Sequence, residues 1–339
     1  MSVRVGILSF AHVHAPQYAA VLSTLDAADF LGIADEDVAR GREAAERFGV
    51  RFLEDARELF EAADAVVVCS ENARHRRDVV AALEGGAHVL CEKPIATTVE
   101  DALAMIRASE RTGRQLRTAF PVRYLPAVRR AYEVVRSGGV GRVLAVSGTN
   151  HGQNPGGWFN DLSLSGGGAV MDHTVHVADA LRWMFGAEAA SVYAEVGSLF
   201  GAEGIDDAGI LTLELEGGLA EGAFATIDPS WSRGGGYPTW GDVTLRIAGT
   251  AGVLEVDAFA RRLTVFDHDA GTTVWEPTGE DMNRLMLEAF VRGVEEGLPG
   301  AASDLASGLD GLRALEIALA AYRSGATGEP VPVERAFTG

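Results

Sequence analysis

Lysine is almost absent from this sequence. One of the 29 basic residues, Lys93, is a lysine, and the other 28 are arginines. An arginine side chain stays protonated in a protein, whereas the pKa of a lysine amine moves readily when the group is buried or lies beside other charges. The one lysine, in Cys91-Glu92-Lys93-Pro94, therefore suggests a position that requires a compact ammonium group. A chance codon choice is the alternative.

Cysteines and long apolar runs are scarce as well. The two cysteines, Cys69 and Cys91, are too few for a disulfide framework. Each ends a short apolar run, so we interpret both as small buried residues of strands. No apolar run approaches the about 18 residues that a membrane span needs, and the N-terminus does not have the pattern of a signal peptide. We expect a cytoplasmic protein that does not bind membranes.

An excess of positive charge is also missing. The formal net charge is −19 at pH 7, and the acidic residues are scattered rather than gathered in a tail. This balance argues against a nucleic acid or an anionic membrane surface as a partner. With 339 residues, of which 47% are hydrophobic, the chain has the composition of a globular protein and room for two domains.

Residues 1–120 alternate short apolar runs with segments of helical period. Strands that are apolar on both faces and alternate with helices indicate a parallel sheet covered on both sides. We therefore predict an α/β domain with a doubly wound parallel sheet of the Rossmann type. The apolar runs are 3–8, 30–34, 65–69 and 87–91, and the helical segments include 38–48, 74–84 and 98–112.

Residues 121–339 have a different pattern. Apolar and polar residues alternate with period two between glycine-rich turns, which indicates a large, mostly antiparallel sheet with one solvated face. Together with four helical segments this predicts an α+β domain. The alternating segments are 142–149, 191–197, 208–215, 219–227, 243–248, 253–257 and 262–266, and the helical ones are 126–137, 172–185, 280–297 and 305–324.

Glycine is missing where a dinucleotide-binding turn needs it. The first apolar run leads into SFAHVHA, in which the glycines of G-x-G-x-x-G would fall on Ser9, Ala11 and His14. The first two side chains are small, and the backbone N–H groups and the helix dipole remain to bind a phosphate. We expect an altered but usable cofactor turn, in which Ser9, Phe10, Ala11 and His12 contact the cofactor.

Acidic residues at the end of the second apolar run bear on the choice of cofactor. Asp35 stands where a carboxylate binds the ribose 2′-hydroxyl of NAD. Glu36 and Asp37 follow, so a 2′-phosphate would meet three carboxylates, and the nearest arginine is Arg40. This favours NAD over NADP. The alternative is that Asp35 only caps the following helix.

The segment SGGGAVMDHTVHVAD (165–179) is the densest chemical signal in the second half. Its three glycines allow a tight turn before a helix on which Asp172 and His176, four residues apart, share a face. An imidazole beside a carboxylate is a suitable general base. His173 lies about 100° around the helix and is a weaker candidate. A buried Asp/His pair without a catalytic role is the alternative.

Two pairs have the spacing of metal ligands. His12 and His14 are one residue apart, and Asp172 and His176 are one helical turn apart. Neither pair has a third ligand nearby in the sequence, and two ligands do not make a site. We therefore predict no metal.

Three stretches, 64–102, 120–143 and 156–186, resemble the Gfo/Idh/MocA oxidoreductases, the relatives of glucose–fructose oxidoreductase and inositol dehydrogenase. Glu92-Lys93-Pro94 followed by Asp172-x-x-x-His176 is the specific part of the match. The resemblance implies a Rossmann domain followed by a domain with a mostly antiparallel sheet. It also implies oligomerisation through that sheet, so a homodimer or homotetramer is expected.

The resemblance assigns roles to individual residues. It places Lys93, Asp172 and His176 at the nicotinamide end of a cleft, as catalytic residues. The cofactor-contacting positions that it implies are Ser70, Asn72, His75, Glu92, Lys93 and Arg123. Candidate substrate contacts are Tyr124, His151, Trp158, Asp161 and His173, and Trp231, Arg233 and Tyr237 lie in a glycine-rich loop that would cover the cleft.

The function that follows is an NAD(H)-dependent dehydrogenase that acts on a secondary alcohol of a sugar, cyclitol or polyol. His176 would take the hydroxyl proton, Asp172 would orient His176 and balance its charge, and Lys93 would stabilise the reacting oxygen. One alternative is a non-catalytic, nucleotide-sensing regulatory protein, which the altered turn favours. Another is an NAD-dependent glycosidase or lyase that keeps its cofactor bound.

Overall fold

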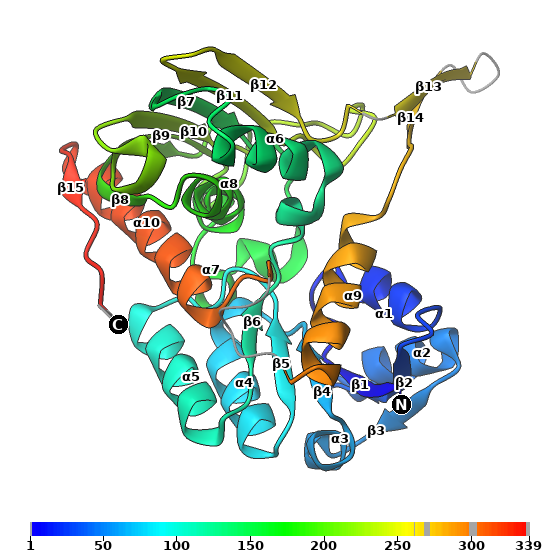
Figure 1. Cartoon of the computed structure of the whole chain (residues 1–339). Coiled ribbons are helices and arrows are strands. Elements are labelled where there is room, and N and C mark those ends of the chain that lie inside the picture. Colours follow the sequence, from blue (N-terminus) through cyan, green and yellow to red (C-terminus); the bar gives the residue numbers. More distant parts are fainter. Residues whose placement is uncertain (1, 261, 268–271, 298–303, 337–339) are drawn as a thin grey trace. The chain divides into compact units, whose positions relative to one another are not determined.

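The computed structural model describes residues 2–260, 262–267, 272–297 and 304–336. The chain divides into two compact units, drawn together in Figure 1. The first unit consists of Met1–Pro121, Ser163–Gly166 and Met282–Leu315, and the second of Val122–Leu162, Gly167–Asp281 and Glu316–Gly339. Two segments from later in the chain, Ser163–Gly166 and Met282–Leu315, thus cluster with its N-terminal part.

The first unit contains a six-stranded sheet in which all neighbouring strands are parallel, in the order β3-β2-β1-β4-β5-β6. This confirms the doubly wound α/β fold. The two outermost strands have three residues each, too few to stand out as apolar runs. The strands are β1 (Val3–Leu8), β2 (Ala28–Ala34), β3 (Arg51–Leu53), β4 (Ala65–Val68), β5 (His88–Cys91) and β6 (Leu116–Thr118).

Helices cover both faces of this sheet. One group consists of α3 (Ala56–Ala62), α4 (His75–Glu84) and α5 (Val99–Thr112), and α1 (Ala15–Leu22), α2 (Val38–Phe48) and α9 (Met282–Glu295) form the other. α2 shows how the sequence sets such a helix: Asp37 caps its first amides, and Gly49 ends it in the left-handed conformation, with φ 67°. Because all strands are parallel, the loops after β1, β2, β4 and β5 meet at one edge.

The second unit contains a seven-stranded sheet in the order β12-β11-β7-β10-β9-β8-β15. β7 and β10 are parallel and the other neighbours antiparallel, which confirms the predicted sheet. A separate hairpin is formed by β13 (Arg262–Asp267) and β14 (Thr272–Pro277). The strands of the large sheet are β7 (Val143–Thr149), β8 (Glu188–Gly197), β9 (Ala208–Glu216), β10 (Phe224–Asp228), β11 (Thr244–Gly249), β12 (Val253–Asp257) and β15 (Val331–Pro332).

The strand predicted at 219–227 is shorter than expected. β10 begins at Phe224, because residues 218–220 form a 3₁₀ turn and Gly222 has a φ of 70°. The alternation of small and apolar residues before it belongs to the turn rather than to the ladder.

Helix α8 (Ala169–Phe185) is the centre of the second unit. It packs against β9, β10 and α6 (Pro126–Arg136), and all but two of its residues, Arg182 and Trp183, are buried. It begins three residues before the predicted start at 172. α7 (Leu162–Ser165) is a single turn, and α10 (Gly308–Thr327) contributes residues to both units.

Cys69 and Cys91 are completely buried, as predicted from the apolar runs that they end. Burial raises the pKa of both thiols well above the usual value, so neither is a ready thiolate. Among the helices in the described part of the chain, none combines the length and apolarity needed to cross a membrane.

Candidate active site

Several backbone N–H groups of the turn after β1 already donate hydrogen bonds to protein groups. Ser9 has a φ of 69°, in the left-handed region that glycine favours. Its hydroxyl accepts a hydrogen bond from the Ala11 N–H at 3.2 Å, Phe10 N–H donates to Asp35 at 2.7 Å, and His12 N–H donates to a backbone carbonyl at 2.9 Å. Three of the amides expected near a phosphate thus donate to protein groups, and the contacts of Ser9, Phe10, Ala11 and His12 with the cofactor stay a prediction.

The acidic residues after β2 all have hydrogen-bond or ion-pair partners. The buried Asp35 carboxylate accepts two hydrogen bonds from Arg40, at 2.8 and 2.7 Å. Asp37 caps α2, and Glu36 pairs with Arg74 at 2.8 Å. A 2′-phosphate would therefore meet carboxylates that already have partners, and Arg40, the nearest arginine in the sequence, is the partner of Asp35.

A cavity of ≈ 520 Å³ opens beside these groups at the edge of the parallel sheet. Ser70, after β4, lines it, and its Oγ is buried without a hydrogen-bond partner among the described residues. A hydroxyl in that state is suited to a ligand hydroxyl or phosphate, so these residues fit the adenosine end of a dinucleotide. The cavity is lined by Leu8, Ser9, Ala34, Asp35, Glu36, Glu54, Asp55, Ala56, Arg57, Phe60, Ser70, Arg74, Arg77, Asp78 and Ala81.

Two histidines of the turn after β1 lie beside the buried carboxylate of Glu92. Nδ1 of His14 lies 3.0 Å from Glu92 Oε1, and Nδ1 of His12 lies 3.6 Å from the same atom. Burial alone would raise the pKa of Glu92, but the charges of His12 and His14 hold it well below the usual range. A third possible ligand for His12 and His14 does exist, contrary to the sequence expectation, 78 positions away from His14.

Hydrogen bonds already connect this group. The His14 N–H donates to His12 Nδ1 at 3.2 Å, and the His14 ring nitrogen contacts the carboxylate at 3.0 Å. The arrangement works as a hydrogen-bond network without an ion. The absence of a metal site stays a prediction.

Lys93 lies directly after this carboxylate, in a cis Lys93–Pro94 peptide. Its side chain is 4% exposed, and its backbone N–H donates to Glu92 Oε2 at 3.0 Å. β5 ends two residues earlier, so Lys93 stands at the edge where the loops of the parallel sheet meet.

Two predicted cofactor contacts face the protein backbone. Asn72 donates to the carbonyl of Ser165 at 2.9 Å. The fully buried His75 ring places Nδ1 3.0 Å from the Pro94 carbonyl and Nε2 3.1 Å from the Ser70 carbonyl. His75 thereby connects the loops after β4 and β5, and a direct contact of either residue with a cofactor stays a prediction.

Asp172, His173 and His176 are all buried on α8. Asp172 Oδ2 lies 3.2 Å from His173 Nε2 and accepts a hydrogen bond from Trp231 Nε1 at 3.3 Å. His173 was expected to contact substrate, yet its ring lies against the Asp172 carboxylate. The convergence of Asp172 and His176 with Lys93, which belongs to the first unit, stays a prediction.

The start of α8 is held by residues that the sequence did not reveal. The Gly168 and Val170 N–H groups each donate to the Asp206 carboxylate at 2.8 Å, and the Tyr322 hydroxyl donates to it at 2.8 Å. A Cβ on Gly168 would lie 1.8 Å from the Asp206 carbonyl oxygen, so this position admits only glycine. No local pattern could have identified Asp206, because its partners lie 36 and 38 positions earlier.

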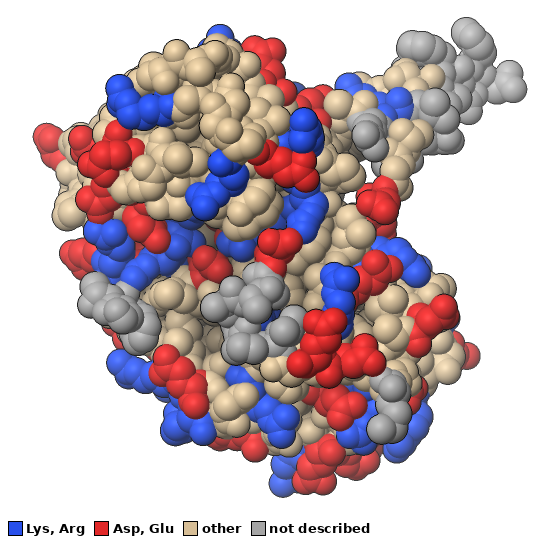
Figure 2. Space-filling model, viewed as in Figure 1, with Lys and Arg blue, Asp and Glu red and all other residues tan. Residues whose placement is uncertain are grey.

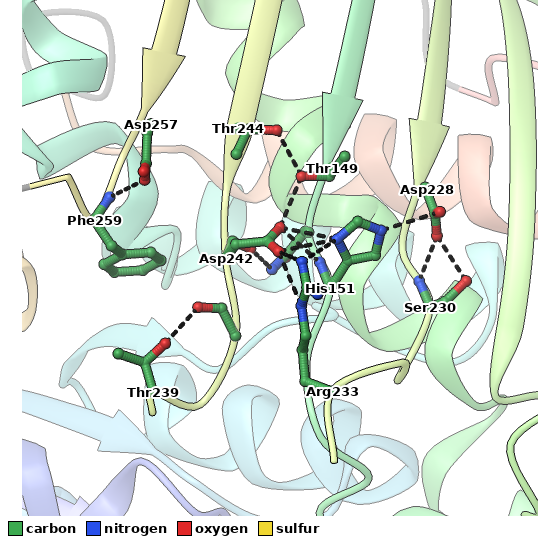
Figure 3. A network of polar contacts seen from close by, with 12 residues as sticks. Thr149, His151, Asp228, Ser230, Arg233, Thr239, Asp242, Thr244, Asp257 and Phe259 are labelled. Atoms are coloured by element: carbon green, nitrogen blue, oxygen red, sulfur yellow. Dashed lines mark hydrogen bonds and ion pairs between the residues drawn. The ribbon is translucent and has the colours of Figure 1, made fainter. Parts of the chain in front are cut away.

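His151 is the centre of the polar network in Figure 3. Its Nε2 lies 3.0 Å from Asp228 Oδ2 and its Nδ1 lies 3.0 Å from Asp242 Oδ2. The hydrogen bonds to Asp228 and Asp242 raise the pKa of His151 to about 9. Arg233 also donates to Asp242, from Nε at 3.1 Å. Both ring nitrogens therefore bind carboxylates, which joins the loops after β7 and β10.

Arg123, expected near the cofactor, is almost completely buried and binds Asp179 of α8. Its Nε and Nη2 donate to the two carboxylate oxygens at 2.7 and 2.6 Å. A bidentate pair of this kind fixes the segment before α6 on the buried helix. Asp179 could not be predicted, because no pattern in the sequence links it to Arg123, 56 positions earlier.

The remaining candidates for substrate binding differ in exposure. Tyr124 is buried, with the Arg129 guanidinium 5.3 Å from its ring centre. Trp158 is half-buried and stacks on Phe159 at 3.9 Å, whereas Asp161 is exposed. In the glycine-rich loop, Arg233 lies 4.4 Å from the ring of Tyr237. Their contacts with a substrate stay predictions.

Comparison with known proteins agrees with this architecture. Residues 3–120 match the family model described as "Oxidoreductase family, NAD-binding Rossmann fold", and residues 128–255 match the "GFO/IDH/MocA C-terminal domain". The chain is 30% identical to the 1,5-anhydro-D-fructose reductase of Ensifer adhaerens over 80% of each chain. It is 28% identical to the myo-inositol 2-dehydrogenase of Thermotoga maritima, over 95% of this chain and 96% of that one.

A solved structure supports the fold over almost the whole length. The crystal structure of a probable dehydrogenase from Thermotoga maritima superposes with a TM-score of 0.82 at 26% identity, over 98% of this chain and 99% of the other. The chain therefore belongs to the Gfo/Idh/MocA family of oxidoreductases, and residues 3–120 are its NAD-binding Rossmann domain.

Proposed function

We propose that this oxidoreductase transfers hydride between NAD(H) and a secondary alcohol of a sugar, cyclitol or polyol. The observation that carries the proposal is that three side chains are buried in a chain that has both family domains. They are Lys93, which follows Glu92, and Asp172 and His176, which lie on α8. The substrate class is supported by the names of two relatives, a reductase of 1,5-anhydro-D-fructose and a dehydrogenase of myo-inositol.

The proposed roles follow from the chemistry of the side chains. His176 accepts the hydroxyl proton, and Asp172 keeps its neighbour on α8 in position. The Lys93 ammonium donates a hydrogen bond to the reacting oxygen and stabilises its developing negative charge. When bound, the nicotinamide accepts the hydride. Ser9, Asp35 and Ser70 would hold the adenosine end, in the cavity that they line.

Turnover of a substrate panel tests the proposal. The purified protein is incubated with NAD and with myo-inositol, a 1,5-anhydrohexitol, a set of aldoses and a set of alkyl glycosides, and NADH absorbance and glycoside cleavage are followed. Continuous NADH release with at least one polyol is expected. If NADH stays bound while a glycosidic bond is cleaved, the protein is an NAD-dependent glycosidase or lyase, and if NAD binds without any reaction, it is a regulatory protein.

We also propose a homodimer or homotetramer that assembles through the face of the seven-stranded sheet opposite α8. Exposed apolar side chains on adjacent strands, Ile210 of β9 and Phe224 of β10, support this surface. Light scattering of the wild type and of Phe224→Asp tests it, because a charge in the contact should release monomers.

The free, buried Cys69 and Cys91 support a cytoplasmic location.

A further inference from the structure

One carboxylate oxygen of Asp172 contacts two neighbouring side chains. His173 Nε2 lies 3.2 Å from Oδ2, and Trp231 Nε1 donates to the same atom at 3.3 Å. None of the three side chains lies at the surface, since each residue is at most 5% exposed. On the other side of the His173 ring, Nδ1 lies 3.1 Å from the carbonyl oxygen of Pro229. The ring is therefore held between a carboxylate and a carbonyl.

These partners determine how many protons the ring and the carboxylate share. A carbonyl oxygen only accepts, so Nδ1 of His173 carries a proton. Nε2 faces a carboxylate, so one further proton lies between Nε2 and Oδ2. The Trp231 N–H favours the ionised carboxylate, which places that proton on the imidazole. His173 and Asp172 together then carry no net charge.

A slot in the protein fixes the ring in this orientation. A Cβ on Gly152 would come within 2.3 Å of His173 Cε1, so the backbone after β7 lies directly against the ring. The Pro229 carbonyl belongs to the loop after β10. His151, next to Gly152, binds Asp228, next to Pro229, at 3.0 Å, as Figure 3 shows. This ion pair joins the two walls of the slot.

We propose that His173 is a positioning residue for Asp172 and, through it, for His176, and that the loops after β7 and β10 form the slot that holds it. The inference rests on the proposed role of His176 as the base. It assigns His151 and His173, both expected to contact substrate, to the support of α8.

The consequence concerns the basicity of His176. Asp172 and His176 are neighbours one turn apart on α8, and an ionised carboxylate there favours the protonated imidazole. The positive charge of His173 offsets that of Asp172, so His176 is less readily protonated than it would be beside the carboxylate alone. The other carboxylates that lie on α8 or bind it, among the described residues of the second unit, have partners: Asp179 binds Arg123, Asp206 binds the helix amides, and Glu188 binds Arg182.

The test measures kcat/KM against pH for two variants and a control. His173→Gln offers a neutral N–H in place of the charge, and Gly152→Ala forces the ring out of the slot. Both should move the acid limb of the profile to higher pH by about one unit, because the positive charge of His173 then no longer offsets that of the Asp172 carboxylate. Gly197→Ala, at the end of β8, adds a Cβ that meets nothing within 4 Å and should leave the profile unchanged.

An unshifted acid limb in His173→Gln overturns the proposal. Nitrogen-15 NMR of the wild type with labelled histidine gives a second measurement, in which protonation of both ring nitrogens of His173 supports the proposal and a bare Nδ1 or Nε2 overturns it. This arm needs no turnover and no variant. A failure of the proposed function, seen as no NADH formation by the wild type, is therefore distinguishable from a failure of this inference.

Discussion

The turn before α1 and the turn before α8 fix their backbones by different means. The first has no glycine, and its own side chains, Ser9 Oγ and His12 Nδ1, accept hydrogen bonds from its amides. The second follows three glycines, and Asp206, far along the chain, binds its amides. A turn that is held by hydrogen bonds, both within itself and to Asp35, tolerates small changes in its side chains, whereas one that fits directly against a distant backbone leaves no space.

Lys93→Arg and His176→Ala test whether the two units contribute to one reaction, and we expect the largest effects from them. Arginine keeps the charge but places a wide, planar group where a compact ammonium must reach one oxygen. Turnover should fall by about 10²–10⁴-fold in both variants, with little change in NAD affinity. Stopped-flow kinetics and calorimetry measure the two quantities, and unchanged turnover in Lys93→Arg would remove the lysine from the mechanism.

Gly168→Ala should break the second turn. The added Cβ would lie 1.8 Å from a backbone oxygen that cannot move without shifting the segment that caps α8. We expect a loss of about 3 kcal/mol in the free energy of unfolding, measured by urea denaturation. Gly235→Ala, which adds a Cβ in open space, is the matched control. Equal stability of the two variants would show that the cap adapts.

The contrast between the turns also explains how far the sequence could be interpreted. Period and apolar runs predicted both sheets and α8, because these depend on local pattern. Asp206, Tyr322 and Asp179 could not be predicted, because each acts through a contact with a residue distant in the chain. The pairing of Asp35 with Arg40 is local, at five residues, but the sequence does not say which way the arginine turns.

The network around His151 makes the loops after β7 and β10 sensitive to pH. The pKa of His151 is about 9 in the folded protein, mainly because of Asp228, and about 6.5 in an unfolded chain. A raised folded pKa contributes stability that is complete below pH 6.5 and is lost as the pH rises to 9. After solvent screening we expect about 1–2 kcal/mol. Denaturation at pH 6 and pH 9 measures it, and His151→Gln should flatten the difference.

Arg40→Ala tests the compensated carboxylate beside the first turn. Removing the guanidinium leaves Asp35 with unopposed charge and two acceptor positions for ribose hydroxyls. The ratio of NADP affinity to NAD affinity should fall at least about tenfold, or 1.4 kcal/mol, mostly through weaker NADP binding. Arg47→Ala, which removes an exposed arginine of α2 that lies over the ring of Phe48 and outside the cavity, is the control. Calorimetry with both cofactors decides, and an unchanged ratio would exclude Arg40 from cofactor choice.

Ala11→Gly restores a glycine to the first turn, and we expect the smallest effect from it. The Ala11 N–H donates to Ser9 Oγ at 3.2 Å, a bond that does not involve the methyl group and is therefore retained. If the methyl group crowds the pyrophosphate, NAD should bind up to about threefold more tightly in the variant, and otherwise equally well. A clear loss of NAD affinity would contradict this, because it would mean that the alanine holds the turn in its binding conformation. Because glycine also adds freedom to the unfolded chain, stability must be measured beside affinity. A loss of stability without a loss of affinity would show that the turn before α1, unlike that before α8, keeps its shape through its own hydrogen bonds.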